Sequence, residues 1–212
     1  RTWTITPKTA AELPPALESL LVARIDRLEP GARRLAQVAA AVGREFPVSV
    51  AAAVAGSAEG DIAELLRAEI VREVRRFPEL ECTFRHGLLQ EAALSTLTPT
   101  SQRELYGRIG HAMEAHLGDQ VDERLEQLAF YFYRSDETDK GLAYLDRAAE
   151  HAATVEALER AEQLWERERR LAERVGDRNR MEHVDGRLAW LRKRSNGELP
   201  LAPDAETGGG TG

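Results

Sequence analysis

Residues 83–94 read Thr-Phe-Arg-His-Gly-Leu-Leu-Gln-Glu-Ala-Ala-Leu. The run Leu80–Phe84 that leads into them predicts a short strand, and the apolar positions after Gly87 predict an amphipathic helix that extends to Leu97. One histidine, His86, therefore lies where a strand ends and a helix begins. Few other runs in the chain have the character of a chemical motif, so this junction is the leading candidate for a functional site.

The segment upstream of this junction predicts a small helical domain with a wing. The nearly alternating run Val71–Phe77 predicts a second strand, and Pro78-Glu79 predicts the turn between the two strands. Helices are predicted before the wing, including Val48–Ala55 and a helix that starts at Asp61 as its N-cap. Residues 43–47 are predicted to form a turn. Three helices followed by a two-stranded wing predict a winged helix over residues 31–98, after a linker and helix over residues 1–30.

The second half of the chain predicts helices throughout, over residues 99–194. Small and aromatic positions fall at the offsets of a tetratricopeptide repeat of roughly 34 residues. These repeat-packing residues are Ala129, Phe132, Gly141, Leu145 and Ala148. In the following repeat Glu168 occupies a position that calls for a small residue, so the array reads as degenerate, and a generic helical bundle stays open as an alternative. Residues 195–212 are predicted to be a disordered tail.

The composition restricts the classes of function. With 212 residues, a formal net charge of −7 and a pI near 5.4, the chain does not have the basic balance of a nucleic-acid-binding protein. The single cysteine, Cys82, excludes an internal disulfide and predicts a buried strand residue. No apolar run approaches the roughly 20 residues that span a bilayer, and no signal-peptide pattern is present. We therefore expect no membrane association and a cytoplasmic location. Because the chain begins at Arg1, we expect it to be a piece of a longer protein.

The usual enzymatic motifs are not found. The sequence contains no phosphate-binding P-loop, no dinucleotide glycine fingerprint and no nucleophile elbow, which predicts that the chain is not an enzyme by itself. The carboxylates of Glu156–Arg174 are interpreted as parts of a solvated, charge-paired helix. His111 and His116 are too far apart in helical phase to share a metal ion, and His151 and His183 are isolated, so no metal site and no cofactor are predicted.

His86 differs from the other histidines because of its place. Unpaired N–H groups and the helix dipole at a helix N-terminus favour an anion, and an imidazole there can donate to a phosphate oxygen. The alternative is a structural role, in which His86 caps its own helix or packs beneath the wing.

Three collinear runs resemble the STAND-type signalling ATPases: Leu13–Leu28, Ala36–Phe46 and Thr83–Leu97. The third is similar to the Phe-x-His-x-Leu-hydrophobic-Gln-Glu run that closes the winged helix in that family, whose members include ATPase regions attached to bacterial adenylate cyclases and transcriptional activators. The resemblance implies an ATP- or ADP-binding core upstream of Arg1, a nucleotide-sensing role for His86 with Arg85, and a protein or small-molecule inducer as partner. Gly87 departs from the plant resistance-protein version of this run, which has an aspartate there.

Two other functions stay open from the sequence. The chain could be a free-standing helical-repeat scaffold with no nucleotide role. It could also be a winged-helix DNA-binding regulator, with Arg72, Arg75 and Arg76 on the wing as the DNA contacts. The helix that would read DNA carries Asp61, Glu64 and Glu69 against Arg67, so nucleic acid is the weaker expectation.

Overall fold

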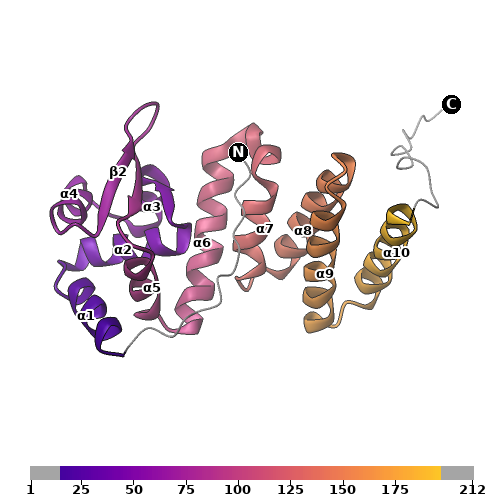
Figure 1. The fold of residues 1–212 in the computed structure, drawn as a ribbon, viewed down its shortest axis with the longest axis horizontal. Coiled ribbons are helices and arrows are strands. Elements are labelled where there is room, and N and C mark those ends of the chain that lie inside the picture. Colours follow the sequence, from indigo (N-terminus) through magenta and orange to yellow (C-terminus); the bar gives the residue numbers. More distant parts are fainter. Residues whose placement is uncertain (1–14, 197–212) are drawn as a thin grey trace. The chain divides into compact units, whose positions relative to one another are not determined.

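The computed structural model describes residues 15–196, in two compact units with a boundary between His116 and Leu117. This described part of the chain is mainly helical and contains one small antiparallel sheet (Figure 1). Residues 1–14 of the predicted linker and residues 197–212 of the predicted tail lie outside the described residues.

The first unit interleaves helices with three short strands. Its elements are α1 (Pro15–Asp26), α2 (Pro30–Val42), β1 (Glu45–Pro47), α3 (Val48–Ala55), α4 (Glu59–Arg67), β2 (Val71–Arg75), β3 (Glu81–Phe84), α5 (Gly87–Ser95) and α6 (Pro99–Leu117). Helix α2 begins with a proline, where the missing N–H costs no helical hydrogen bond, and it buries an almost unbroken alanine and leucine face against α3, α4 and α5. The small sheet packs against the core that these helices form.

The sheet has the strand order β1–β3–β2, with both pairings antiparallel. The two strands predicted for the wing form and pair with each other as β2 and β3, but the prediction of a turn over residues 43–47 was wrong, because Glu45–Pro47 form a third strand. Phe46 pairs with Cys82 and is buried, and its ring centroid lies 5.9 Å from that of Phe84. Three residues are too few to show an alternating pattern, and proline is tolerated in an edge strand. Strand β1 is therefore held in place by its pairing with β3 and by the burial of the Phe46 ring.

Helix α4 begins earlier and ends earlier than predicted. Asp61 is the third helical residue and not the N-cap, and its carboxylate accepts a hydrogen bond from the Ala58 backbone N–H at 2.8 Å. Glu69 lies beyond the helix in a left-handed conformation with φ of 54°. Arg24 donates to the carbonyl oxygen of Ala68 at 2.7 Å, which satisfies a terminal acceptor at this sharp turn into β2.

The compact first unit includes more of the chain than the predicted winged-helix range of 31–98. Helix α1 packs on α5, and α6 belongs to this unit by its contacts. The Arg108 guanidinium of α6 donates to the carbonyl oxygen of Val54 in α3, and His116 lies 3.4 Å from the Glu79 carboxylate. These polar contacts hold α6 beside α3 and the turn after β2.

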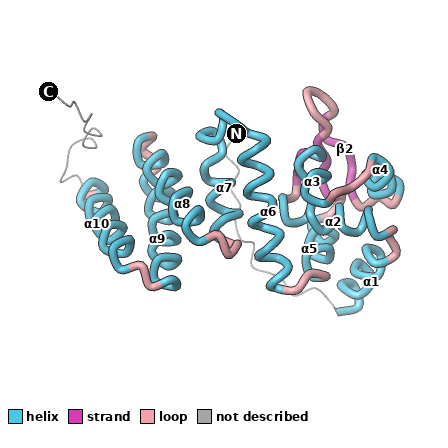
Figure 2. Tube along the Cα trace, turned by 180° about the vertical axis from the view of Figure 1, so that it is seen from behind, coloured by secondary structure: helices cyan, strands magenta, loops and turns pink. Residues whose placement is uncertain are grey.

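The second unit is a row of antiparallel helices. A 3₁₀ helix (Gly118–Arg124) precedes α7 (Leu125–Tyr133), α8 (Thr138–Thr154), α9 (Leu158–Val175) and α10 (Arg178–Ser195). Each helix packs on the next, and Figures 1 and 2 show α7 to α10 side by side in chain order. The dipeptides Ser135-Asp136 and Gly176-Asp177 lie between consecutive helices. Gly176 adopts a left-handed conformation that ends α9 without the strain that another residue would carry.

The five residues predicted to pack the repeat all lie in the core between α7 and α8. The rings of Phe132 and Tyr144 stack with centroids 5.4 Å apart. Gly141 permits the close approach of neighbouring elements, since a Cβ atom there would lie 3.2 Å from the Phe132 carbonyl oxygen and 2.9 Å from Leu171 Cδ2. A small residue is therefore required at Gly141 by contacts from both α7 and α9.

Candidate functional site

His86 is the N-cap residue of α5. Its backbone is extended, with φ of −136° and ψ of 141°, and its carbonyl oxygen accepts the Leu89 N–H at 3.0 Å. The side chain is exposed and does not cap the helix. Among residues 15–196, the imidazole makes no hydrogen bond or ion pair, so the structure assigns it neither of the two structural roles considered above.

Both neighbouring strands fix the backbone that carries His86. The Phe84 N–H donates to the carbonyl oxygen of Arg44 at 3.1 Å, and the Thr83 hydroxyl donates to the same oxygen at 2.9 Å. On the other side the Arg85 N–H donates to the carbonyl oxygen of Ile70 at 3.0 Å. The imidazole therefore projects from a firmly held backbone segment just after the end of the central strand, β3.

Two arginines lie near the start of α5. Arg85, predicted to act with His86, is exposed and forms an ion pair with Glu69 at 3.2 Å. Arg44, which sequence reasoning missed, places Nη1 4.0 Å from where a Cβ of Gly87 would be. No local pattern links Arg44 to this helix, because the β1–β3 pairing brings the two together. An imidazole, a guanidinium and free helical N–H groups together suit an anion such as a phosphate.

The wing arginines are mostly neutralised within the sheet. The Arg75 guanidinium forms an ion pair with Glu81, and Arg76 pairs with Glu73 at 2.7 Å. Arg72 is exposed. Since two of the three predicted DNA contacts already face carboxylates, they add little positive potential for a phosphate backbone.

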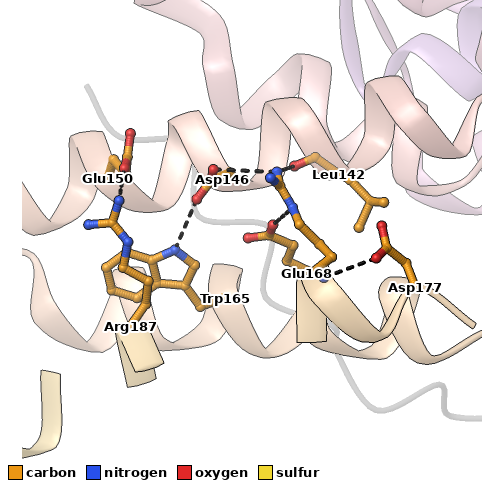
Figure 3. A network of polar contacts seen from close by, with 8 residues as sticks. Leu142, Asp146, Glu150, Trp165, Glu168, Asp177 and Arg187 are labelled. Carbon is orange, nitrogen blue, oxygen red and sulfur yellow. Dashed lines mark hydrogen bonds and ion pairs between the residues drawn. The ribbon is translucent and has the colours of Figure 1, made fainter. Parts of the chain in front are cut away.

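A second polar cluster, centred on the fully buried Glu168 in α9, was missed from the sequence (Figure 3). Arg180 of α10 places Nε 2.5 Å from Oε1 of Glu168 and Nη2 3.3 Å from Oδ2 of Asp146 in α8. Arg180 also donates to the carbonyl oxygen of Leu142 at 3.2 Å. The Trp165 indole N–H donates to Asp146 at 3.5 Å. One guanidinium therefore ties three consecutive helices together.

Burial has a marked effect on the Glu168 carboxyl group. Desolvation, reinforced by the negative charge of Asp146 and opposed by Arg180, raises the pKa of Glu168 to about 7. The interpretation of Glu156–Arg174 as entirely solvated was wrong at this position. A signal was present, because Glu168 shares a helical face with Ala161, Trp165 and Ala172, all of which are buried.

The remaining candidate residues show fewer features of a functional site. His111 and His116 each lie beside a glutamate, at 3.3 Å and 3.4 Å. Within residues 15–196 no group of three histidine, cysteine, aspartate or glutamate residues could hold a metal ion, and no helix has the length and apolar character needed to cross a membrane. Cys82 is buried as predicted, and burial followed by the Glu73 charge raises the pKa of its thiol to about 11.

Comparisons of the sequence with protein-family models and with curated proteins, and of the fold with solved structures, find no match.

Proposed function

We propose that this chain is the regulatory arm of a STAND-type signalling ATPase. In this proposal a winged helix, residues 31–98, senses the nucleotide state of an upstream ATPase core. Tetratricopeptide-like helix pairs over residues 99–194 couple that state to a protein or small-molecule inducer. The chain itself has no catalytic role, and ATP or ADP is bound by the upstream core.

The observation that carries the proposal is the exposed imidazole of His86 at the N-terminus of α5. A sensor must be able to reach a nucleotide held by another domain, and an imidazole that capped its own helix could not do so. Helix dipole and unpaired N–H groups favour a phosphate at this end of α5. The nearby Arg44 guanidinium adds a positive charge to the same place.

The mechanism would be a population shift between two domain arrangements. A nucleotide phosphate that bridges His86 and the core stabilises the closed arrangement, and loss of that contact releases the arm. The coupling is set by the difference in nucleotide contacts between the arrangements, typically about 1–3 kcal/mol. The anchoring of β3 by Arg44 and Ile70 would convert a local phosphate contact into movement of the whole unit.

The test uses a protein extended upstream to include the predicted core, with ADP release followed by fluorescence of a labelled ADP. His86→Ala should accelerate release by roughly tenfold, in line with one hydrogen bond to a charged group. His183→Ala, at an exposed position on α10, is the matched control and should leave release unchanged. Equal release rates from the His86→Ala variant and the unaltered protein would contradict the sensor role.

A second candidate, a helical interaction scaffold without nucleotide, is favoured by one observation. The second unit buries a continuous apolar core from α7 to α10. This candidate takes precedence if ADP binding by the extended protein is insensitive to both His86→Ala and Arg44→Ala.

A further inference from the structure

Helix α9 carries a row of arginines along one face. Arg160, Arg167, Arg170 and Arg174 recur at helical spacing, which places them on the same side of the helix. Arg134, the C-cap residue of α7, also belongs to this surface, because it follows Tyr133, whose ring lies beside the Arg174 guanidinium. These five residues form the arginine surface, which contrasts with the formal net charge of −7 of the whole chain.

The contacts between α7 and α9 show which way the surface faces. Arg160 pairs with the Glu126 carboxylate of α7, with an Nε to Oε2 distance of 3.0 Å. Fourteen residues further along α9, the Arg174 guanidinium lies 5.9 Å from the centroid of the Tyr133 ring. The arginine surface therefore runs beside the exposed edge of α7 over roughly 20 Å, at 1.5 Å per helical residue.

The neighbouring carboxylates do not pair with every guanidinium group of the arginine surface. Glu126 serves Arg160, and Glu166 lies 3.8 Å from Arg170. Arg167 and Arg174 form no ion pair with the other described residues. Burial and the charges of Arg160, Arg170 and Arg134 lower the pKa of the half-buried Arg167 guanidinium. Like charges held this close are a cost to the fold that an anionic partner would remove.

We infer that the arginine surface binds an acidic, partly apolar peptide segment of a partner protein. Guanidinium groups pair bidentately with carboxylates, and the row offers several such pairs along one line. Arg134 lies over the half-buried Phe130 ring, 4.5 Å from its centroid, and Arg174 lies beside the half-buried Tyr133 ring, so aromatic surface of α7 adjoins these guanidinium groups. A peptide that alternates acidic and apolar side chains matches both features. A long polyanion matches them less well, because the negative charge of the rest of the chain would repel it.

The experiment measures fluorescence anisotropy of a labelled peptide of alternating glutamate and leucine with the full chain. A peptide of the same length with glutamine in place of each glutamate is the control ligand. Arg167→Glu combined with Arg174→Glu should weaken binding of the acidic peptide by roughly tenfold or more, and added salt should weaken binding to the unaltered chain. Arg178→Glu combined with Lys193→Glu makes the same change of charge on exposed positions of α10 and should change binding by less than about twofold.

Several outcomes would overturn the inference. If the glutamine peptide binds as tightly, carboxylates are not recognised. If both double variants weaken binding equally, only net charge matters and no particular surface binds. If a single-stranded oligonucleotide of equal charge displaces the peptide at lower concentration, the surface serves nucleic acid. Circular dichroism and thermal unfolding of each double variant identify a loss of binding that comes from a loss of fold, in which case the single Arg174→Gln variant, at an exposed position, decides the question.

Discussion

The Arg180 guanidinium of α10 holds the fully buried carboxylate of Glu168 in α9, with Nε 2.5 Å from Oε1. A buried ion pair adds little net stability over a well-packed apolar pair, but removal of one partner is costly because the other charge remains buried. Glu168 and Arg180 thus act mainly as a specific connection between α9 and α10.

The first prediction concerns that connection. Arg180→Ala leaves an uncompensated carboxylate and should lower the free energy of unfolding by about 3 kcal/mol at pH 8. Urea denaturation followed by circular dichroism measures the change. Arg187→Ala is the matched control, since Arg187 pairs with the partly exposed Glu150 and should cost about 1 kcal/mol or less. Equal losses for the two variants would show that the Glu168 charge is not effectively buried.

The second prediction is a pH dependence of stability that depends on Glu168. Its pKa is raised from 4.5 to about 7 in the folded protein, so the folded state binds more protons than the unfolded state between these values. The Glu168 contribution is therefore greatest at low pH and is lost as pH rises through this window, by on the order of 2 kcal/mol. Urea denaturation at pH 5 and pH 8 should show this loss for the unaltered chain and a smaller one for Glu168→Gln. Identical pH dependence of stability in the two proteins would show that Glu168 is not the group responsible.

The third prediction compares two helical glycines. Alanine at Gly141 would place Cβ 2.9 Å from Leu171 Cδ2 and 3.2 Å from the Phe132 carbonyl oxygen, so Gly141→Ala should destabilise the protein by about 1–3 kcal/mol. Gly186 has no atom within 4 Å of a built Cβ, so Gly186→Ala should stabilise it by up to about 1 kcal/mol. Thermal unfolding distinguishes the opposite signs, and a stabilising Gly141→Ala would mean that α7, α8 and α9 separate readily.

The fourth prediction concerns the thiol of Cys82. Because it is fully buried and its pKa is raised to about 11, it should not react with iodoacetamide at pH 8 in the folded chain. Mass spectrometry should detect the adduct only after urea is added. Rapid labelling of the folded protein would indicate that β3 opens frequently between its two neighbouring strands.

The sequence was a good guide to elements with a clear period and a poor guide to those defined by distant contacts. The helices of the second unit and the strands around Pro78 follow from the spacing of apolar residues. Strand β1 does not, because three residues show no period and Phe46 is explained only by its pairing with β3. Helix α4 ends early because Glu69 turns the chain toward β2, where a helical pattern would continue.

The same division applies to the candidate site. His86 was found because a strand-to-helix junction is a local feature. Arg44 and Arg180 were missed because each reaches its partner through tertiary packing and not through a contact local in the sequence. Glu168 was visible in principle, but a glutamate in a charged helix is ordinarily solvated, and only the fold shows that its position faces inward.

The burial of Glu168 also has a consequence for any shortened form of the protein. A chain cut at Gly176 would keep the buried apolar face of α9 and its carboxylate but lose the arginine that balances it. Such a truncation would expose leucine and tryptophan side chains around an unneutralised charge. A stable piece of the protein that contains α9 must therefore also contain Arg180 in α10, because its guanidinium balances the buried carboxylate of Glu168.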